Sequence, residues 1–267
     1  MKRRSMFWQE VKRGTTGFLV TLVMWPIFSG PAWAVHPLIT DDTGTQGEGK
    51  FQVEVNGEYS HHHDNGVTVD TFEASTIISY GIIDPVDLVL AVPYQHIRTK
   101  QAGDRDSEDG VSDLSLEVKW RLWEDEPLGL SFAVKPGITF PTGDAERGMG
   151  AGRPNCTLFF IATEKVAPWA FHLNLGYLRN ENKVDERRDL WHASLASELE
   201  IFEGLKLVGN IGVERNPDKE SNTDPAFILG GLVYSIAENL DVDVGVKGGL
   251  TRTEVDYSFM AGLAWRF

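Results

Sequence analysis

Ionisable side chains recur at every second position in several short segments of the chain. The clearest segment is 113–121, where Asp113, Glu117, Lys119 and Arg121 alternate with apolar residues. Alternate residues of an extended strand share one face, so these four side chains are expected to point the same way. Charges of both signs on one face can pair into a network, or they can line a polar pathway for a solute. The sequence leaves both interpretations open.

The same alternation supplies a larger set of polar residues, which are the candidates to line a pore if the charges form such a pathway. A Lys or Arg side chain that faces lipid at the bilayer midplane costs about 2–4 kcal/mol, so charged residues of a membrane strand must point inward or lie at the rim. The predicted pore-lining set comprises Asp113, Glu117, Lys119, Arg121, Lys135, Asn174, Asp241, Asp243, Lys247 and Arg266.

His192 and Ser194 could support hydrolysis, because outer-membrane phospholipases use a His-x-Ser pair on one strand face. A serine nucleophile also needs an orienting group next to its base, and the sequence does not identify one. Leu195 and Ala196 follow Ser194 here, where those enzymes have Asn and Gly. The alternation also turns the pair toward the lumen, where a lipid substrate does not reach. We therefore expect no enzymatic activity, and a hydrolase is the least favoured alternative.

Metal ligands are sparse in the sequence. His61, His62 and His63 are adjacent, in what we expect to be a loop, and three adjacent side chains cannot all point at one ion. Asp41 and Asp42 are two neighbouring acids without further spaced oxygen ligands, which makes a weak cation site. The chain has a single cysteine and therefore no intrachain disulfide. We expect neither a metal nor a cofactor.

The last twelve residues, 256–267, show which element positions these side chains. Their sequence is DYSFMAGLAWRF, and Tyr257, Phe259, Leu263 and Phe267 fall on one face of a strand. An apolar strand face with an aromatic residue at each end is typical of a strand that faces lipid between two membrane interfaces. A final strand that reaches the last residue is also expected in a closed barrel, because closure removes the free edge.

Eleven earlier segments show the same period of two, between turn residues. The twelve predicted strands lie within 51–59, 72–80, 88–94, 114–122, 130–140, 156–162, 169–177, 191–199, 205–213, 228–234, 240–250 and 257–267. Short connections alternate with generally longer, charged ones, such as 98–111 and 141–153. Outer-membrane barrels combine short periplasmic turns with longer outside loops, whereas a soluble sandwich or barrel has no reason to alternate them.

The N-terminus predicts export. Five basic residues precede an apolar run at 18–28, and Ala32-Trp33-Ala34 is a typical cleavage site, so 1–34 is predicted to be a signal peptide. The run is too short for a transmembrane anchor, and no later segment predicts a transmembrane helix. Cleavage after Ala34 would leave 20 basic and 38 acidic residues, a net charge of −18, which argues against a nucleic-acid partner.

Four motifs in the mature chain carry a family resemblance. They are residues 37–47 (PLITDDTGTQG), 110–116 (GVSDLSL), 141–144 (PTGD) and 148–150 (GMG). Together they resemble the outer-membrane MetA-pathway family of phenol degradation, whose members are often labelled transporters. The resemblance implies an outer-membrane barrel that passes aromatic or other hydrophobic compounds, and it brings no binding residues. Judged by its residues alone, PTGD is a strand terminator followed by a turn.

We therefore predict an all-β fold, an up-and-down antiparallel transmembrane barrel of about twelve strands. The expected organisation is a signal peptide at 1–34, a periplasmic segment at 35–49 and an outer-membrane barrel at 50–267. The predicted function is passive uptake of small hydrophobic or aromatic compounds through the outer membrane of a Gram-negative bacterium. The alternative is a side-chain-filled structural barrel without transport. Expected partners are outer-membrane lipid and lipopolysaccharide, the barrel assembly machinery and a small-molecule solute.

Overall fold

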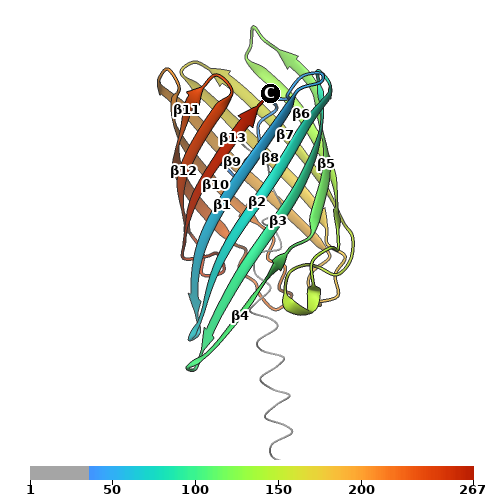
Figure 1. Ribbon diagram of the computed structural model, residues 1–267, viewed down its shortest axis with the longest axis vertical. Coiled ribbons are helices and arrows are strands. Elements are labelled where there is room, and N and C mark those ends of the chain that lie inside the picture. The colour runs from blue at the N-terminus through green and yellow to red at the C-terminus, as the bar shows by residue number, and fades with distance from the viewer. Residues whose placement is uncertain (1–35) are drawn as a thin grey trace, which may run out of the picture.

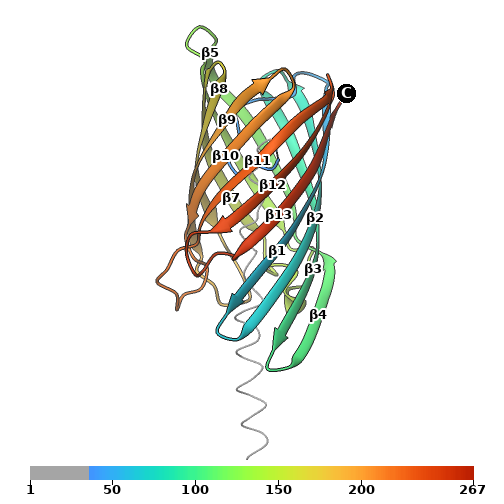
Figure 2. The same cartoon turned by 90° about the vertical axis from the view of Figure 1, so that its left-hand side faces the viewer.

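The computed structural model describes residues 36–267, so the predicted signal peptide at 1–34 lies outside the described residues. The strands are β1 (Phe51–Asp64), β2 (Val67–Ile83), β3 (Val86–Gln101), β4 (Asp104–Val111), β5 (Leu114–Asp125), β6 (Leu130–Phe140), β7 (Asn155–Val166), β8 (Trp169–Arg179), β9 (Asp189–Phe202), β10 (Leu205–Glu214), β11 (Ala226–Ala237), β12 (Leu240–Gly249) and β13 (Tyr257–Arg266). A short 3₁₀ helix, η1 (Ala145–Arg147), lies between β6 and β7. Figure 1 and Figure 2 show one tilted antiparallel barrel.

The barrel has twelve strands, as predicted, because β4 and β5 pair with successive parts of β3 and act as one strand. The first and last strands close it: β1 pairs with β13 from Gln52–Arg266 to His61–Tyr257. Phe51 and Phe267 exchange both backbone hydrogen bonds, at 2.8 and 2.9 Å, so the last residue of the chain takes part in the closure. Closure satisfies backbone groups that would otherwise form an edge in lipid.

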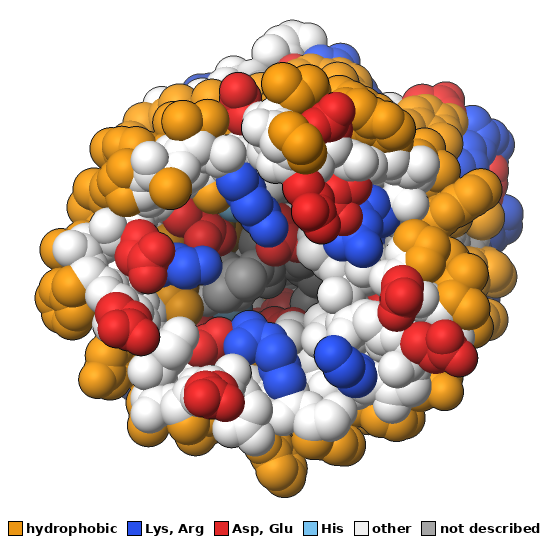
Figure 3. Space-filling view, turned by 90° about the horizontal axis from the view of Figure 1, so that it is seen from above, with side chains coloured by type: hydrophobic (Ala, Val, Ile, Leu, Met, Phe, Trp, Pro, Cys, Tyr) orange, Lys and Arg blue, Asp and Glu red, His pale blue; other side chains and the backbone are white. Residues whose placement is uncertain are grey.

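The two strand faces separate apolar from polar side chains, as the alternation predicts. Leu175 and Leu195 are about half exposed on the outside, whereas their neighbours Asn174 and Ser194 are buried inside. The space-filling view in Figure 3 shows hydrophobic side chains around the rim and charged ones around the central opening. Strand 156–162 follows the same alternation, because Leu158 is exposed and Ile161 is buried.

The two ends of the barrel differ. Short turns and the C-terminus lie at one end, here called the turn end, and longer connections lie at the other, the loop end (Figure 1). At the loop end β1–β4 extend beyond the rest of the wall (Figure 2). Among residues 36–267, no helix is long and apolar enough to cross a membrane.

Two segments predicted as loops are strands. Residues 98–111 form the end of β3 and all of β4, and His61, His62 and His63 lie on β1. Both hairpins use two-residue turns with positive φ at each central position, at Asn65-Gly66 and Ala102-Gly103. Such turns match the twist of paired strands, so the strands continue to the tip of each hairpin.

Candidate functional site

The lumen contains the first described segment of the chain. Residues 36–46, here called the belt, run along the inner wall and contact successive strands from β12 round to β3. The belt has no regular secondary structure. It belongs to the segment 35–49 that was expected to precede the barrel on the periplasmic side, and the structure places residues 36–46 inside the barrel. A polar, turn-rich segment can be buried only where the wall satisfies its backbone groups.

Inward side chains of the wall supply those partners. The Asn210 side-chain oxygen on β10 accepts hydrogen bonds from the backbone N–H groups of Ile39 and Thr40, at 2.8 and 3.0 Å. Asn174 on β8 bonds both the N–H and the carbonyl of Asp41, each at 2.8 Å. On β3, the Asp87 carboxylate accepts from the Gln46 N–H at 2.9 Å. The wall therefore replaces the hydrogen bonds that a sheet or water would provide.

Further contacts come from hydroxyl groups and from the start of the belt. The Thr40 hydroxyl donates to Ser194 Oγ at 2.7 Å. The Thr43 N–H donates to Thr163 Oγ1 at 3.1 Å, and the Thr43 hydroxyl bonds that of Ser131. At the start of the belt, His36 Nδ1 bonds the Asp243 carboxylate on β12. Each of these wall positions is an inward residue of its strand, which is why the contacts follow the circumference of the barrel.

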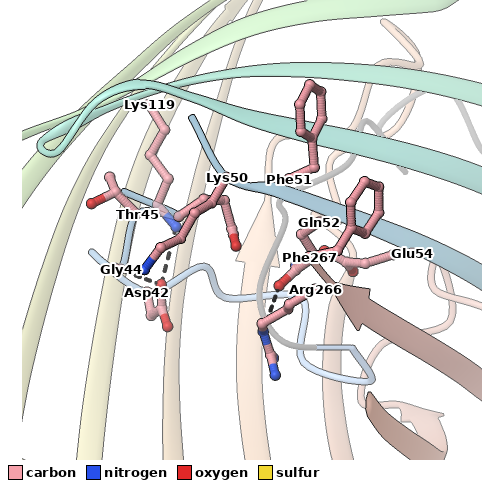
Figure 4. Close-up of a pocket in the computed structure, with 11 residues that line it drawn as sticks. Asp42, Gly44, Thr45, Lys50, Phe51, Gln52, Glu54, Lys119, Arg266 and Phe267 are labelled. Carbon is pink, nitrogen blue, oxygen red and sulfur yellow. Dashed lines mark hydrogen bonds and ion pairs between the residues drawn. The ribbon is translucent and has the colours of Figure 1, made fainter. Parts of the chain in front are cut away.

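Asp41 forms the ionic centre of the belt. Its two carboxylate oxygens accept from Lys119 Nζ on β5 at 2.9 Å and from Lys135 Nζ on β6 at 2.8 Å. Asp42 accepts a second bond from Lys119 at 3.0 Å, which Figure 4 shows, and Glu117 lies 3.6 Å from Lys135. Asp41 and Lys135 are almost fully buried. Buried charges at these distances are stable only as a paired group.

An apolar patch on the inner wall covers the other side of the belt. Leu38 packs in a buried cluster with residues of β9, β10, β11 and β13, and Ile39 packs against that cluster. The wall members are Ala196, Val208, Phe227, Leu229, Val233 and Met260. Close by, Pro37 fills the space above two glycines: a Cβ added to Gly231 or Gly245 would lie 2.6 or 2.7 Å from it. The belt thus has ionic partners on β5 and β6 and apolar partners on β9, β10, β11 and β13.

A polar cavity of about 460 Å³ opens between the belt and the turn end. It is lined by Asp42, Gly44, Thr45, Gln46, Lys50, Phe51, Gln52, Glu54, Lys119, Arg266 and Phe267. Figure 4 shows Arg266 directed toward Gln52, to which it donates at 2.8 Å. The ionic side chains that line this cavity come from both the belt and the wall of the barrel.

At the loop end, three of the sequence motifs meet in one structure, here called the latch. Asp113 Oδ1 accepts from the Gly143 N–H at 2.9 Å, and Oδ2 accepts from the Ala151 N–H at 2.8 Å. The Ser112 hydroxyl donates to the Met149 carbonyl at 2.7 Å. A Cβ at Gly150 would lie 2.2 Å from Asp113 Oδ1, so only glycine fits there. PTGD therefore does more than end a strand: it is bonded to the GVSD motif and holds the β6–β7 connection in place.

Two buried side chains complete the loop end. Met149 packs against Val67, Val69 and Ile97 of the extended strands. In the β8–β9 connection, burial raises the pKa of Glu186 to about 7, nearby Asp218 adds to the shift, and a hydrogen bond from Asn180 Nδ2 at 3.0 Å opposes it. Burial likewise raises the pKa of Asp113, against the effect of its two backbone donors.

Four of the ten predicted pore-lining residues contact the belt, namely Lys119, Lys135, Asn174 and Asp243. The other six lie elsewhere on the wall. Glu117 lies beside Lys135, and Asp113 lies in the latch. The remaining four form ion pairs: Asp241 with Arg266 at 2.7 Å, Arg121 with Glu124 at 3.2 Å, and Lys247 with Glu58 and Glu254 at 3.2 and 3.6 Å. Each of the five Lys and Arg residues of the set is therefore ion-paired, in line with the first of the two interpretations, whereas Asp113 is held by backbone N–H groups.

His192 and Ser194 lie inside the barrel, as the alternation predicts. Ser194 Oγ lies 2.9 Å from His192 Nε2, and His192 Nδ1 lies 3.4 Å from Glu214. This is a serine–histidine–acid arrangement, but Ser194 also accepts the Thr40 hydroxyl, so the group forms part of the attachment of the belt. On β1, His61 bonds Asp70 at 2.7 Å, and no three His, Cys, Asp or Glu side chains within 36–267 are grouped to hold a metal.

Sequence reasoning missed the belt as part of this site. Asp41 was considered only as half of a weak cation site, Leu38 and Thr40 were noted only as part of a family motif, and Asn210 was expected to face the lumen but not to bind another segment of the chain. The signal was nevertheless present, because residues 37–47 are the first motif of the family resemblance.

Comparison of folds returns outer-membrane β-barrels. The NanC porin matches with a TM-score of 0.53 and 9% identity, over 80% of this chain and 98% of that chain. The KdgM porin matches with 0.54 and 8%, over 81% and 99%. The translocator domain of the autotransporter NalP from Neisseria meningitidis matches with 0.52 and 10%, over 96% and 98%. At these identities the likeness shows the fold alone.

Sequence comparison adds the family. No curated protein matches the chain significantly. A family model does match, over residues 36–267, a range that begins with the belt and includes the latch and every strand. The chain therefore belongs to the family described as "Putative MetA-pathway of phenol degradation".

Proposed function

We propose that this protein is an outer-membrane channel for the passive uptake of small hydrophobic or aromatic compounds, which the belt holds closed. The observation that carries the proposal is the apolar patch on the inner wall, where Leu38 packs among Val208, Phe227, Leu229, Val233 and Met260. A neutral aromatic solute can replace the contacts that Leu38 makes, because the hydrophobic effect is not directional.

The construction of the belt supports a removable closure. Wall side chains hold it through hydrogen bonds and ion pairs, without strand pairing to the wall. Water can satisfy the same groups once the belt leaves, so release need not break the barrel. The ladders that hold the strands, including β1 with β13, do not involve residues 36–46.

The relatives support the class of function. The matching family takes its description from phenol degradation, and the fold occurs in porins, one of which is described in complex with disordered oligogalacturonate. The proposed location is the outer membrane of a Gram-negative bacterium, reached after cleavage of residues 1–34. Outer-membrane lipid, lipopolysaccharide and the barrel assembly machinery are the proposed partners.

A side-chain-filled structural barrel is the second candidate. The paired interior charges favour it, because every predicted lining Lys and Arg residue has an acidic partner. The two candidates respond differently to a loosened belt: a channel conducts more, whereas a filled barrel only becomes less stable.

Uptake of a neutral phenolic solute into proteoliposomes tests the proposal. Leu38→Ala removes the apolar anchor of the belt and should increase uptake several-fold. Leu195→Ala is the matched control, because it makes the same change on the lipid face of β9, where Leu195 is 51% exposed. If neither the wild-type protein nor Leu38→Ala passes phenolics or ions, the filled structural barrel is the better account.

A further inference from the structure

Between β5 and β6 the backbone pairing skips two positions, here called the interruption, while the register stays the same on both sides. These strands pair from Leu114–Phe140 to Glu117–Gly137, and pairing resumes at Trp120–Val134. In this register Val118 stands opposite Pro136 and Lys119 stands opposite Lys135, but neither couple forms a ladder pair. Proline has no N–H to donate and is normally confined to edges and bulges of sheets.

On the lumen side, the interruption lies beneath the ionic centre of the belt. Lys119 and Lys135 approach it from the two strands, and both bind the carboxylate of Asp41. Two ammonium groups so close together repel each other unless an anion lies between them. Asp41 therefore joins β5 to β6 at the place where the backbone pairing does not, and the longer Glu117–Lys135 ion pair, at 3.6 Å, is a second link.

Neighbouring residues fit this role for Asp41. Glu117 reaches Lys135 at 3.6 Å by crossing over Gly137, where an added Cβ would lie 2.8 Å from Glu117 Cγ. Asp42 holds Lys119 at 3.0 Å. When the belt leaves, Asp41 and Asp42 leave together, and Glu117 is the carboxylate of this group that remains on the wall.

On the lipid side, the interruption is apolar. Pro136 is exposed, and Trp120, 50% exposed, and Leu158, 51% exposed, lie beside it on β5 and β7. By contrast, a solute that continues along the barrel axis enters the cavity at the turn end, where the charged side chains of Asp42, Glu54, Lys119 and Arg266 lie beside the rings of Phe51 and Phe267 (Figure 4). An apolar solute gains more by entering lipid than by entering that cavity.

We propose that the interruption between β5 and β6 is a lateral exit that Asp41 keeps closed. Release of the belt removes the carboxylate from between Lys119 and Lys135, the two strands separate locally, and a small neutral aromatic solute passes from the lumen into the bilayer. This inference rests on the proposed function and adds its route and its control.

A reversible cross-link tests the route. Val118→Cys with Pro136→Cys, in a Cys156→Ser background, places two thiols across the interruption. The matched control, Leu116→Cys with Ile138→Cys in the same background, places them across an intact pair of the same strands. Each variant is compared with itself in the oxidised and reduced states, so any effect of the substitutions themselves cancels. The measurements are uptake of a neutral aromatic solute into proteoliposomes and ion conductance in planar bilayers.

Oxidation of the 118–136 variant should lower aromatic uptake at least five-fold, and reduction should restore it, while conductance stays within two-fold. Oxidation of the 116–138 control should change neither quantity. Equal uptake in the two states of the 118–136 variant, with the wild-type protein transporting, would overturn the lateral exit and leave the channel proposal intact. Absence of uptake by the wild-type protein, by both reduced variants and by Leu38→Ala would overturn both.

Discussion

Asp41→Asn is the substitution that most directly tests how the belt is held. It removes the charge that binds Lys119 and Lys135 but keeps the size of the side chain. The hydrogen bonds that Asn174 makes to the belt involve only the backbone of residue 41, so they remain available. The change is therefore confined to the ionic centre.

The structure sets the expected magnitude. Removing one member of a buried ion pair costs about 3–5 kcal/mol, because the other charge stays buried. Asp41 serves two ammonium groups, but each keeps a second carboxylate, Asp42 at 3.0 Å from Lys119 and Glu117 at 3.6 Å from Lys135. We therefore expect a loss of about 3–5 kcal/mol, not twice that amount.

Asp42→Asn is the matched control. The Asp42 side chain is 29% exposed and forms one ion pair, so its loss should cost about 1 kcal/mol. Urea unfolding in lipid vesicles measures both free energies, and planar-bilayer recordings should show higher conductance for Asp41→Asn. Equal losses for the two variants, or a larger one for Asp42→Asn, would refute the assignment of Asp41 as the centre.

Three further predictions concern the latch, a loop carboxylate and the lipid face. Asp113→Ala should free the β6–β7 connection at a cost of about 2–4 kcal/mol, seen as faster proteolysis within 141–154, whereas Asp104→Ala at a hairpin tip should have no such effect. The pKa of Glu186 is about 7 in the folded protein, above its usual 4.5, so the stabilising contribution of its protonated form is complete below pH 4.5 and is lost as pH rises through 7. Proteolysis of 180–188 should therefore increase from pH 5 to pH 8. The variant Glu186→Gln should remove this pH dependence. Leu195→Arg should destabilise the barrel by about 2–4 kcal/mol in vesicle unfolding if this strand face meets lipid, and an equally stable variant would contradict the assignment.

The sequence predicts the wall well because the alternation of apolar and polar residues within each strand shows which side chains face outward. Leu175 and Asn174 differ by one position and face opposite sides, and this period of two is visible without any long-range information. The closing strand could be recognised in the same way. The prediction of a loop at 98–111 was wrong. The tight turn at Ala102-Gly103 allows the flanking segments to pair as strands, and charged residues such as Asp104 and Asp106 give no sign of this pairing in the sequence.

The belt could not be predicted in this way. Residues 36–46 have no period, and their position depends on partners far away in the chain, such as Asn210, 170 residues from Thr40. The charges of Lys119 and Lys135 were expected to face the lumen, and the sequence did not show that Asp41 would lie between them. Pairings of this kind are decided by the closed barrel and not by neighbouring residues.

The circumferential course of the belt has a consequence for assembly. Its contacts follow the order of the strands, from Asp243 on β12 to Asp87 on β3, and Lys50 connects it to β1 at the closing seam. The full set of contacts exists only when every intervening strand is present and in register. A barrel that closed with a strand missing or shifted would leave the belt without matching partners, so a docked belt is a mark of correct closure.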